Sequence, residues 1–179
     1  MRADATRNIQ AVLHAAARVF STDPLARISD VAAAAGVDKR TVYRRFDSRE
    51  ELLLAVYRAR LDELEALIDA TLTGDRPVRD ALLAFAEGGI RLSRDWPVDI
   101  RAVTDPAVRE RREELDARMA GFLDRAEESG VIAAGLPAGW SLRTLQTQLH
   151  TVAQEMPALR PGPAAALVVE TFLHGVGAV

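Results

Sequence analysis

RISDVAAAAGVDKRTVYRRF, residues 27–46, is the stretch that decides the fold. It predicts two short helices that meet at a sharp corner. Asp30 suits the positive end of the first helix dipole, and the small apolar residues behind it provide a packing face. Gly36 follows where a helix commonly ends on a left-handed residue, a conformation that a Cβ disfavours. A second helix is therefore expected to begin near Asp38 or Lys39.

The second helix, expected over residues 39–46, has two unlike faces. Val42 and Phe46 are four residues apart and share one side, whereas the remaining surface is cationic or hydrogen-bonding. An apolar seam behind such a face is what a helix needs to lie in a DNA groove. For this stretch alone, an ordinary helical corner with a solvated basic face is the alternative, because such patterns also match by chance.

Spaced residues on both sides of the corner form a wider pattern. They are Val31-Ala32, Ala35-Gly36-Val37, Thr41-Val42-Tyr43, Phe46 and Arg49-Glu50-Glu51-Leu52, after a helix that contains Ala15-Ala16 and Phe20. This order resembles the N-terminal domain of the TetR family of bacterial transcriptional regulators over about residues 7–55. The resemblance implies an all-α fold of about nine helices. An N-terminal three-helix DNA-binding domain of the helix-turn-helix type would precede a C-terminal helical domain for ligand binding and dimerisation.

Five positions depart from the residues usual in that family. Asp38 stands where serine is usual, Arg40 where a small residue is usual, and Arg27 where a helix-capping threonine is frequent. Arg45 and Arg49 replace the usual histidine and lysine. Asp38 would repel a nearby phosphate, or could accept a hydrogen bond from a cytosine amino group. These departures leave the fold unaffected and the operator sequence open.

The resemblance places eight DNA-contacting residues in the N-terminal domain. Those assigned mainly to phosphates are Tyr43, Arg45 and Arg49. Those assigned mainly to base edges in the major groove are Lys39, Arg40, Thr41 and Arg44. Arg27 completes the predicted set. For Arg49, in the first turn of the next helix, a solvated side chain is the alternative to a phosphate contact.

The charge distribution favours the same division of the chain. The 179 residues carry a net charge of −3. Residues 1–49 hold nine Lys and Arg against five Asp and Glu, and residues 50–179 hold fourteen against twenty-one. A basic head on an acidic body orients a molecule on DNA by its field as well as by contact. We therefore expect a DNA-binding domain over residues 1–49 and a regulatory and dimerisation domain over residues 50–179.

Helix signals continue beyond the head. Ser48 and Glu51 have the spacing of a capping box at the start of a helix that reaches about Leu72. Gly88-Gly89 lies within the next predicted helix and permits either a kink or the close approach of a neighbour. A short sixth helix is expected within residues 98–104.

The chain contains no cysteine, which fits a reducing cytoplasm and excludes disulfides and thiolate metal sites. No secretory segment is recognisable at the N-terminus, and no apolar run approaches the roughly 20 residues of a membrane span. We expect a soluble, cytoplasmic, bacterial protein without a membrane partner.

The resemblance also implies a small-molecule pocket among the central helices. Its candidate lining combines apolar walls with two polar groups: Phe85, Trp96, Met119, Phe122, Gln146 and His150. For each of them, packing in an ordinary core is the alternative. The chemistry of the ligand is not readable from the sequence.

The last two predicted helices are where the family forms its homodimer, as a four-helix bundle from two chains. The apolar residues assigned to this interface are Leu142, Leu145, Leu149, Val152, Leu167, Val168, Thr171 and Phe172. They are equally compatible with the core of a single chain.

Catalytic patterns are weak. The three histidines lie far apart without metal-ligand spacing, and neither a phosphate-binding glycine loop nor a nucleophile elbow is recognisable. No catalytic residue, metal or cofactor is assigned. The sequence favours a repressor that binds a palindromic operator in double-stranded DNA as a homodimer and is released by a small-molecule inducer. The alternatives are a helical dimeric adaptor or, less favoured, a small-molecule enzyme. Regulated genes, the inducer's existence and identity, the pocket lining, and repression against activation stay open.

Overall fold

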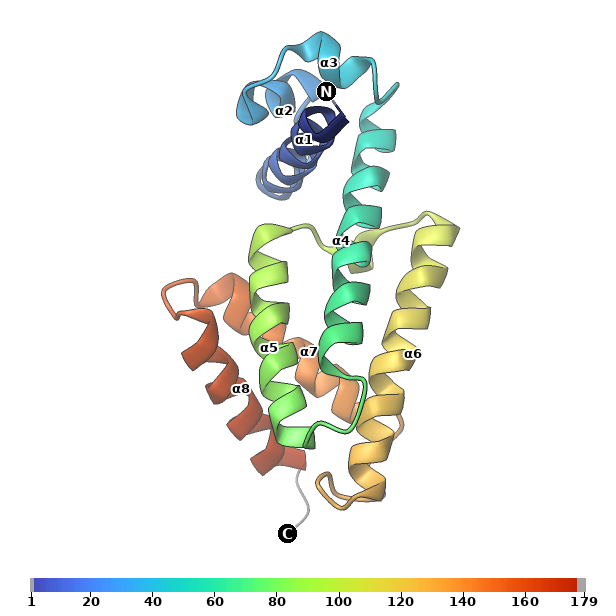
Figure 1. Ribbon diagram of the computed structural model, residues 1–179, viewed down its shortest axis with the longest axis vertical. Helices are drawn as coiled ribbons and strands as arrows, with labels where there is room; N and C mark the ends of the chain where they lie inside the picture. The colour runs from blue at the N-terminus through green and yellow to red at the C-terminus, as the bar shows by residue number, and fades with distance from the viewer. Residues whose placement is uncertain (1, 177–179) are drawn as a thin grey trace. The chain divides into compact units, whose positions relative to one another are not determined.

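The computed structural model describes residues 2–176 and the side chains of residues 8–175. Within this range the fold is all-α, which confirms the predicted class (Figure 1). The expected sixth helix proves to be a short 3-10 helix. The elements are α1 (Arg2–Thr22), α2 (Ile28–Ala35), α3 (Lys39–Tyr43), α4 (Arg49–Thr71), α5 (Val78–Asp95), η1 (Ile100–Ala102), α6 (Pro106–Glu128), α7 (Trp140–Glu155) and α8 (Pro161–Val176).

The helices pack into two compact units. The first comprises Met1–Asp62 and Asp95–Arg109, and the second comprises Glu63–Arg94 and Glu110–Val179. Helix α4 therefore contributes residues to both units. This grouping describes packing, and the functional boundary expected at residue 49 stays a prediction.

The first unit is built on α1, which braces the α2–α3 corner. Its side chains Val12, Ala16 and Phe20 are buried, as are Val31 of α2 and Val42 of α3. The apolar seam predicted for the corner is thus a real core, and burying it fixes which faces of α2 and α3 remain in solvent.

The corner has the predicted glycine geometry. Gly36 adopts a φ of 67°, and its N–H donates to the Ala33 carbonyl at 3.2 Å. The N–H of Val37 donates to the Ala32 carbonyl at 3.0 Å. These bonds satisfy carbonyl groups that the end of α2 would leave free, in a backbone conformation that favours glycine.

Helix α3 is shorter than the predicted span of residues 39–46. It ends at Tyr43, and the next two residues form a turn. The Phe46 N–H still donates to the Val42 carbonyl at 2.9 Å, and the Phe46 side chain is buried within the first unit. The prediction overshot because the chain must already turn here to start α4 at Arg49.

The start of α4 confirms one half of the predicted capping box. The Ser48 Oγ accepts a hydrogen bond from the Glu51 N–H at 3.0 Å. The Glu51 carboxylate reaches one residue further back than expected and accepts from the Asp47 N–H at 2.6 Å. Both bonds satisfy backbone donors around the first turn.

The segment between α5 and α6 belongs to the first unit and is anchored there by Trp96. The indole is fully buried, and its ring centroid lies 4.2 Å from that of His14 on α1. The Arg60 Nε of α4 donates to the Trp96 carbonyl at 3.3 Å. The 3-10 helix follows, with the Asp99 carboxylate accepting from the Arg101 N–H at 3.0 Å.

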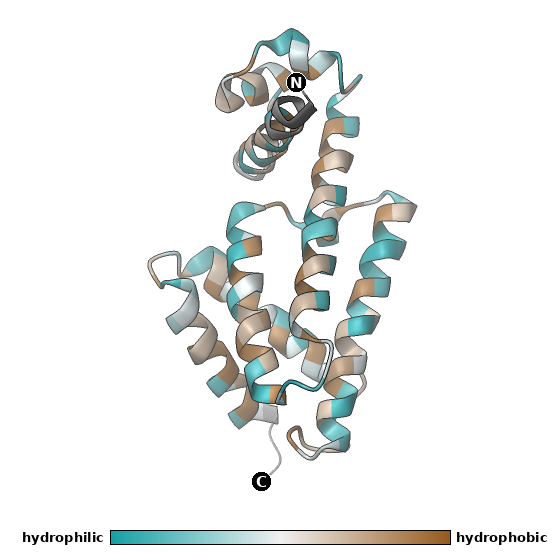
Figure 2. Ribbon diagram, in the orientation of Figure 1, coloured by the Kyte–Doolittle hydropathy of each residue, from teal (hydrophilic) through white to brown (hydrophobic). Residues whose placement is uncertain are grey.

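The second unit contains α5 to α8 and the C-terminal part of α4. That part of α4 lies between α5 and α6 (Figure 1). A methyl group at Gly88 of α5 would overlap the Leu67 side chain of α4, so the first glycine of the predicted pair permits a close approach. Hydrophobic and hydrophilic residues alternate along α5 (Figure 2), and its apolar side includes the buried Leu82, Phe85 and Ile90.

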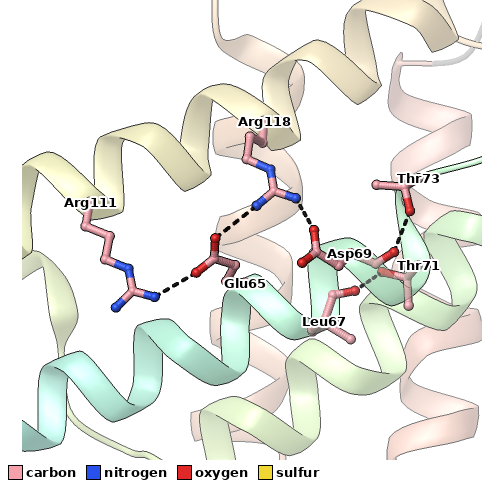
Figure 3. A network of polar contacts seen from close by, with 7 residues as sticks. All are labelled: Glu65, Leu67, Asp69, Thr71, Thr73, Arg111 and Arg118. Atoms are coloured by element: carbon pink, nitrogen blue, oxygen red, sulfur yellow. Dashed lines mark hydrogen bonds and ion pairs between the residues drawn. The ribbon is translucent and has the colours of Figure 1, made fainter.

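Charged side chains of α4 and α6 form an ion ladder, defined as Arg111, Glu65, Arg118 and Asp69 (Figure 3). The Glu65 carboxylate lies 2.7 Å from the Arg111 Nη2 and 3.5 Å from the Arg118 Nη1. Arg118 also pairs with Asp69. All four side chains are partly exposed, so each pair adds at most about 1 kcal/mol of stability.

Candidate nucleic-acid interface

The exposed face of α3 gathers most of the predicted DNA-contacting residues. Val42 is buried and fixes the orientation of the helix, whereas Tyr43 is 49% exposed and Thr41 is half-buried. Hydrophilic colour predominates over α3 and the turn after it (Figure 2). The exposed cations of this face, termed here the α3 cationic face, are Lys39, Arg40, Arg44 and Arg45.

Asp38 has a structural role that the sequence did not reveal. It is the N-cap of α3, and its Oδ1 accepts a hydrogen bond from the Arg40 N–H at 2.7 Å. Aspartate and serine are both favourable N-caps, so the departure from the family's usual serine preserves the start of the helix. The general preference for Asp at this position was the available signal.

Two substitutions of Asp38 distinguish the stabilising effect of its capping hydrogen bond from the effect of its negative charge. Asp38→Ala is expected to lower the free energy of unfolding by about 1 kcal/mol, because an orphan N–H appears at the start of α3. Asp38→Ser keeps an acceptor there and should stay within about 0.5 kcal/mol of the parent protein. Urea unfolding measures both, with exposed Asp47→Ala as the control. Equal losses in the two Asp38 variants would contradict the capping role.

Arg27 lies outside the α3 cationic face, at the N-cap of α2. Its backbone N–H donates to the Asp30 Oδ2 at 2.8 Å, so the cap is completed by Asp30 and not by the arginine side chain. The side chain of Arg27 is exposed. The donor that a threonine hydroxyl would satisfy at this position, the Asp30 N–H, donates instead to the Arg27 carbonyl at 3.0 Å.

Arg49 is placed differently from the other seven predicted residues. Its Nε donates to the Ala26 carbonyl at 3.1 Å, and its Nη2 donates to the Pro24 carbonyl at 2.5 Å. The guanidinium carbon lies 4.5 Å from the centroid of the Phe20 ring. These contacts turn the cation toward the α1–α2 loop.

The predicted ligand-binding residues are divided between the two units. Trp96 packs in the first unit, and the other five belong to the second. Phe85, Met119 and Phe122 are buried, whereas His150 is exposed. A hollow of about 80 Å³ near the α6–α7 loop is lined by Leu136, Trp140 and their neighbours, none of them from the predicted set. The proposed pocket lining stays a prediction.

Gln146 has a partner that the sequence analysis missed. Its Nε2 donates to the Asp116 Oδ1 at 2.8 Å, joining α7 to α6. Burial raises the pKa of Asp116, while this hydrogen bond and the nearby Arg112 oppose that rise. Asp116 stands in a run of charges that reads as solvent-exposed, and a half-buried position within such a run has no local sequence signal.

The raised pKa of Asp116 has a consequence for stability. The folded state holds the proton more tightly than the unfolded state, so this group makes folding less favourable as pH rises through its folded pKa. Asp116→Asn removes the charge and keeps an amide oxygen for Gln146. We expect the variant to be at least as stable as the parent at neutral pH, with any advantage shrinking toward about pH 4. Urea unfolding at both pH values measures this, and an advantage that grows on acidification would contradict it.

The residues predicted for the dimer interface also separate by exposure. Leu142 is half-buried, and Leu167 is 51% exposed with Thr171 exposed beside it. The others are buried within this chain: Leu145, Leu149, Val152, Val168 and Phe172. Most of the residues predicted for the dimer interface on α7 and α8 are therefore buried in the core of this single chain.

A short helical corner with a cationic second helix, braced by a third helix, defines a helix-turn-helix DNA-binding protein. Residues 12–56 match the model of bacterial regulatory proteins of the tetR family. The chain is also 30% identical over 145 residues to the HTH-type transcriptional repressor LfrR of Mycolicibacterium smegmatis, which covers 76% of this chain and 72% of LfrR.

Solved structures show the same fold over nearly the whole chain. LfrR from Mycobacterium smegmatis in complex with proflavine superposes with a TM-score of 0.76 at 24% identity, covering 97% of this chain and 99% of that one. A TetR family transcription regulator from Marinobacter aquaeolei VT8 gives a TM-score of 0.76 at 19% identity, with 100% of both chains covered.

The chain belongs to the TetR family of bacterial regulatory proteins and is a DNA-binding transcriptional regulator. The family predicted from the corner and its flanking residues is confirmed. The relatives named above are transcriptional regulators. Among the described residues, no helix has the length and apolar character needed to span a bilayer.

Proposed function

We propose that this regulator is a repressor that binds a palindromic operator as a homodimer and is released by a small molecule. The observation that carries the proposal is the α3 cationic face, which is exposed while Val42 behind it is buried. Buried Val42 orients the helix, and exposed cations on the opposite side are free to meet a negatively charged groove. A cytoplasmic location follows in the proposal, because the protein must share a compartment with its operator.

The proposed contacts fall into two groups. Those to phosphates are made by Arg27, Tyr43 and Arg45. Those to base edges are made by Lys39, Arg40, Thr41 and Arg44. Arg49 is not among them, because its guanidinium already binds two backbone carbonyls.

The proposed dimer uses the outer faces of α7 and α8. Leu167, Thr171 and His174 are spaced by four and three residues, so they share one side of α8, and all three are exposed. Leu167 is among the few large apolar side chains of the described residues that are more than two-fifths exposed. Its burial against a second copy would remove apolar surface from water.

Release by a small molecule is proposed from the relationship to LfrR, one structure of which contains proflavine. A ligand changes DNA binding only through different affinities for two states of the protein. Helix α4 contributes to both units and is therefore the proposed route between ligand and head.

Selection of duplexes from a random DNA library with the purified protein tests the proposal. We expect enrichment of a palindrome, with affinity falling by a factor of about 10³ or more between roughly 50 and 200 mM salt. Absence of enrichment at either salt concentration would contradict operator binding and favour an adaptor role. Enrichment of a single half-site without symmetry would contradict the dimer.

A further inference from the structure

Arg49 joins the first turn of α4 to the loop between α1 and α2. One guanidinium donates two hydrogen bonds, to the carbonyls of Pro24 and Ala26, and lies over the ring of Phe20. The bonded residues are 25 and 23 positions earlier in the chain. Arg49 is half-buried, in contrast to the exposed arginines of the α3 cationic face. Its contacts are therefore tertiary, one to the carbonyl of the buried Ala26 and one to the carbonyl of the exposed Pro24.

Within the loop that Arg49 binds, Asp23 makes the local hydrogen bonds, and Ala26 is buried. The Asp23 carboxylate accepts from the Leu25 N–H at 2.8 Å, and its carbonyl accepts from the Ala26 N–H at 3.1 Å. These bonds shape the turn locally and do not tie it to another helix. Arg49 supplies that tie, because it reaches the loop from α4.

The Arg49 contacts connect α4 with the loop that precedes α2, on the other side of the helix-turn-helix. The loop leads directly into the N-cap of α2, and the turn after α3 leads directly into the capped start of α4. The peptide chain itself links α3 to α4, and the Arg49 hydrogen bonds link the loop before α2 to α4. The guanidinium thus adds a second constraint on how α3 lies relative to α4, beside the packing of the buried Val42 side chain.

An arginine is suited to this task for geometric reasons. Its planar fork donates two hydrogen bonds at a fixed angle and stacks on an aromatic face at the same time. A lysine in its place would keep the charge but offer a single ammonium group, which cannot reproduce both bonds and the stacking.

We propose that Arg49 is a positioning residue for operator reading: it holds the α1–α2 loop on α4 and so orients α3, and it does not bind a DNA phosphate. This inference rests on the proposed binding of DNA by α3. It replaces the phosphate contact that the sequence predicted for Arg49.

The test compares three variants on the selected operator duplex, with affinity measured across a salt series. Arg49→Met and Arg49→Lys are expected to weaken binding about tenfold at every salt concentration, with an unchanged salt slope. Arg45→Met, the matched control from the α3 cationic face, is expected to lower the slope by about one per head.

Amide hydrogen exchange on the free protein provides a readout without DNA. Exchange at Leu25 and Ala26 is expected to accelerate in both Arg49 variants and to stay unchanged in Arg45→Met. If Arg49→Met does not fold, Arg49→Lys carries the same comparison, because it changes only the head group.

Two outcomes would overturn the proposal. One is a lower salt slope in Arg49→Met together with full affinity in Arg49→Lys, which identifies a phosphate contact. The other is unchanged loop exchange in both variants, which shows that the guanidinium does not hold the loop. Failure of the parent protein to bind any duplex would instead contradict the proposed function, and the exchange measurement would still test the tie.

Discussion

Trp96→Ala is expected to lower the free energy of unfolding by about 3–5 kcal/mol. The indole is fully buried, and alanine would leave a cavity beside His14 that the surrounding helices can fill only in part. Urea unfolding followed by helical circular dichroism measures the loss.

Two controls separate the lost volume from other effects of the substitution. Trp140 is 52% exposed, so Trp140→Ala should stay within about 0.5 kcal/mol of the parent protein. Trp96→Phe should lose less than Trp96→Ala, because the phenyl ring fills much of the space. Trp96→Phe also removes the indole N–H, for which the described residues provide no hydrogen-bond partner. A loss below about 1 kcal/mol in Trp96→Ala would contradict the packing role.

Arg44→Ala is expected to weaken operator binding by about 1–3 kcal/mol per head and to relax the preference at one base position. Arg44 is exposed at the C-cap of α3, on the cationic face opposite buried Val42. A bidentate arginine contact to a base edge is lost completely in alanine, so competing bases at that position should bind almost equally well.

Repeating the duplex selection with the variant measures this change. Arg45→Ala, proposed to contact a phosphate, is the control and should weaken all sequences alike without altering the selected pattern. An unchanged base preference in Arg44→Ala would show that Arg44 does not read a base.

The sequence predicted the features of the head that depend on neighbouring residues. Gly36 ends α2 as expected and Ser48 caps α4, because both signals act within a few positions of the chain. The residues of the α3 cationic face were also predicted from their spacing around Val42. Helix α3 is shorter than predicted because the chain turns after Tyr43 to start α4, and this turn competes with continuation of the helix.

Features that depend on distant residues were not predictable in this way. The carbonyls bound by Arg49 lie in a loop more than twenty residues earlier, and no local pattern relates them. Trp96 likewise follows α5 in the chain but packs on His14 of α1.

The C-terminal helices illustrate a different difficulty. An apolar stripe looks the same in a single-chain core and in an interface between two copies. The exposed fraction of each side chain distinguishes the two cases. Phe172 and Val168 are buried in the chain's own core, whereas Leu167 is exposed on the surface of this chain.

The ion ladder between α4 and α6 makes substitutions at its positions epistatic. Glu65 is shared by Arg111 and Arg118, so the effect of losing one arginine depends on whether the other is present. Removing Glu65 takes a partner from both arginines, although Arg118 keeps Asp69. Removing both arginines leaves Glu65 and Asp69, two carboxylates four residues apart on α4, which repel each other. The effect of any one substitution in the ion ladder therefore depends on which of the other three side chains are still present, so single-variant effects at these positions should not add.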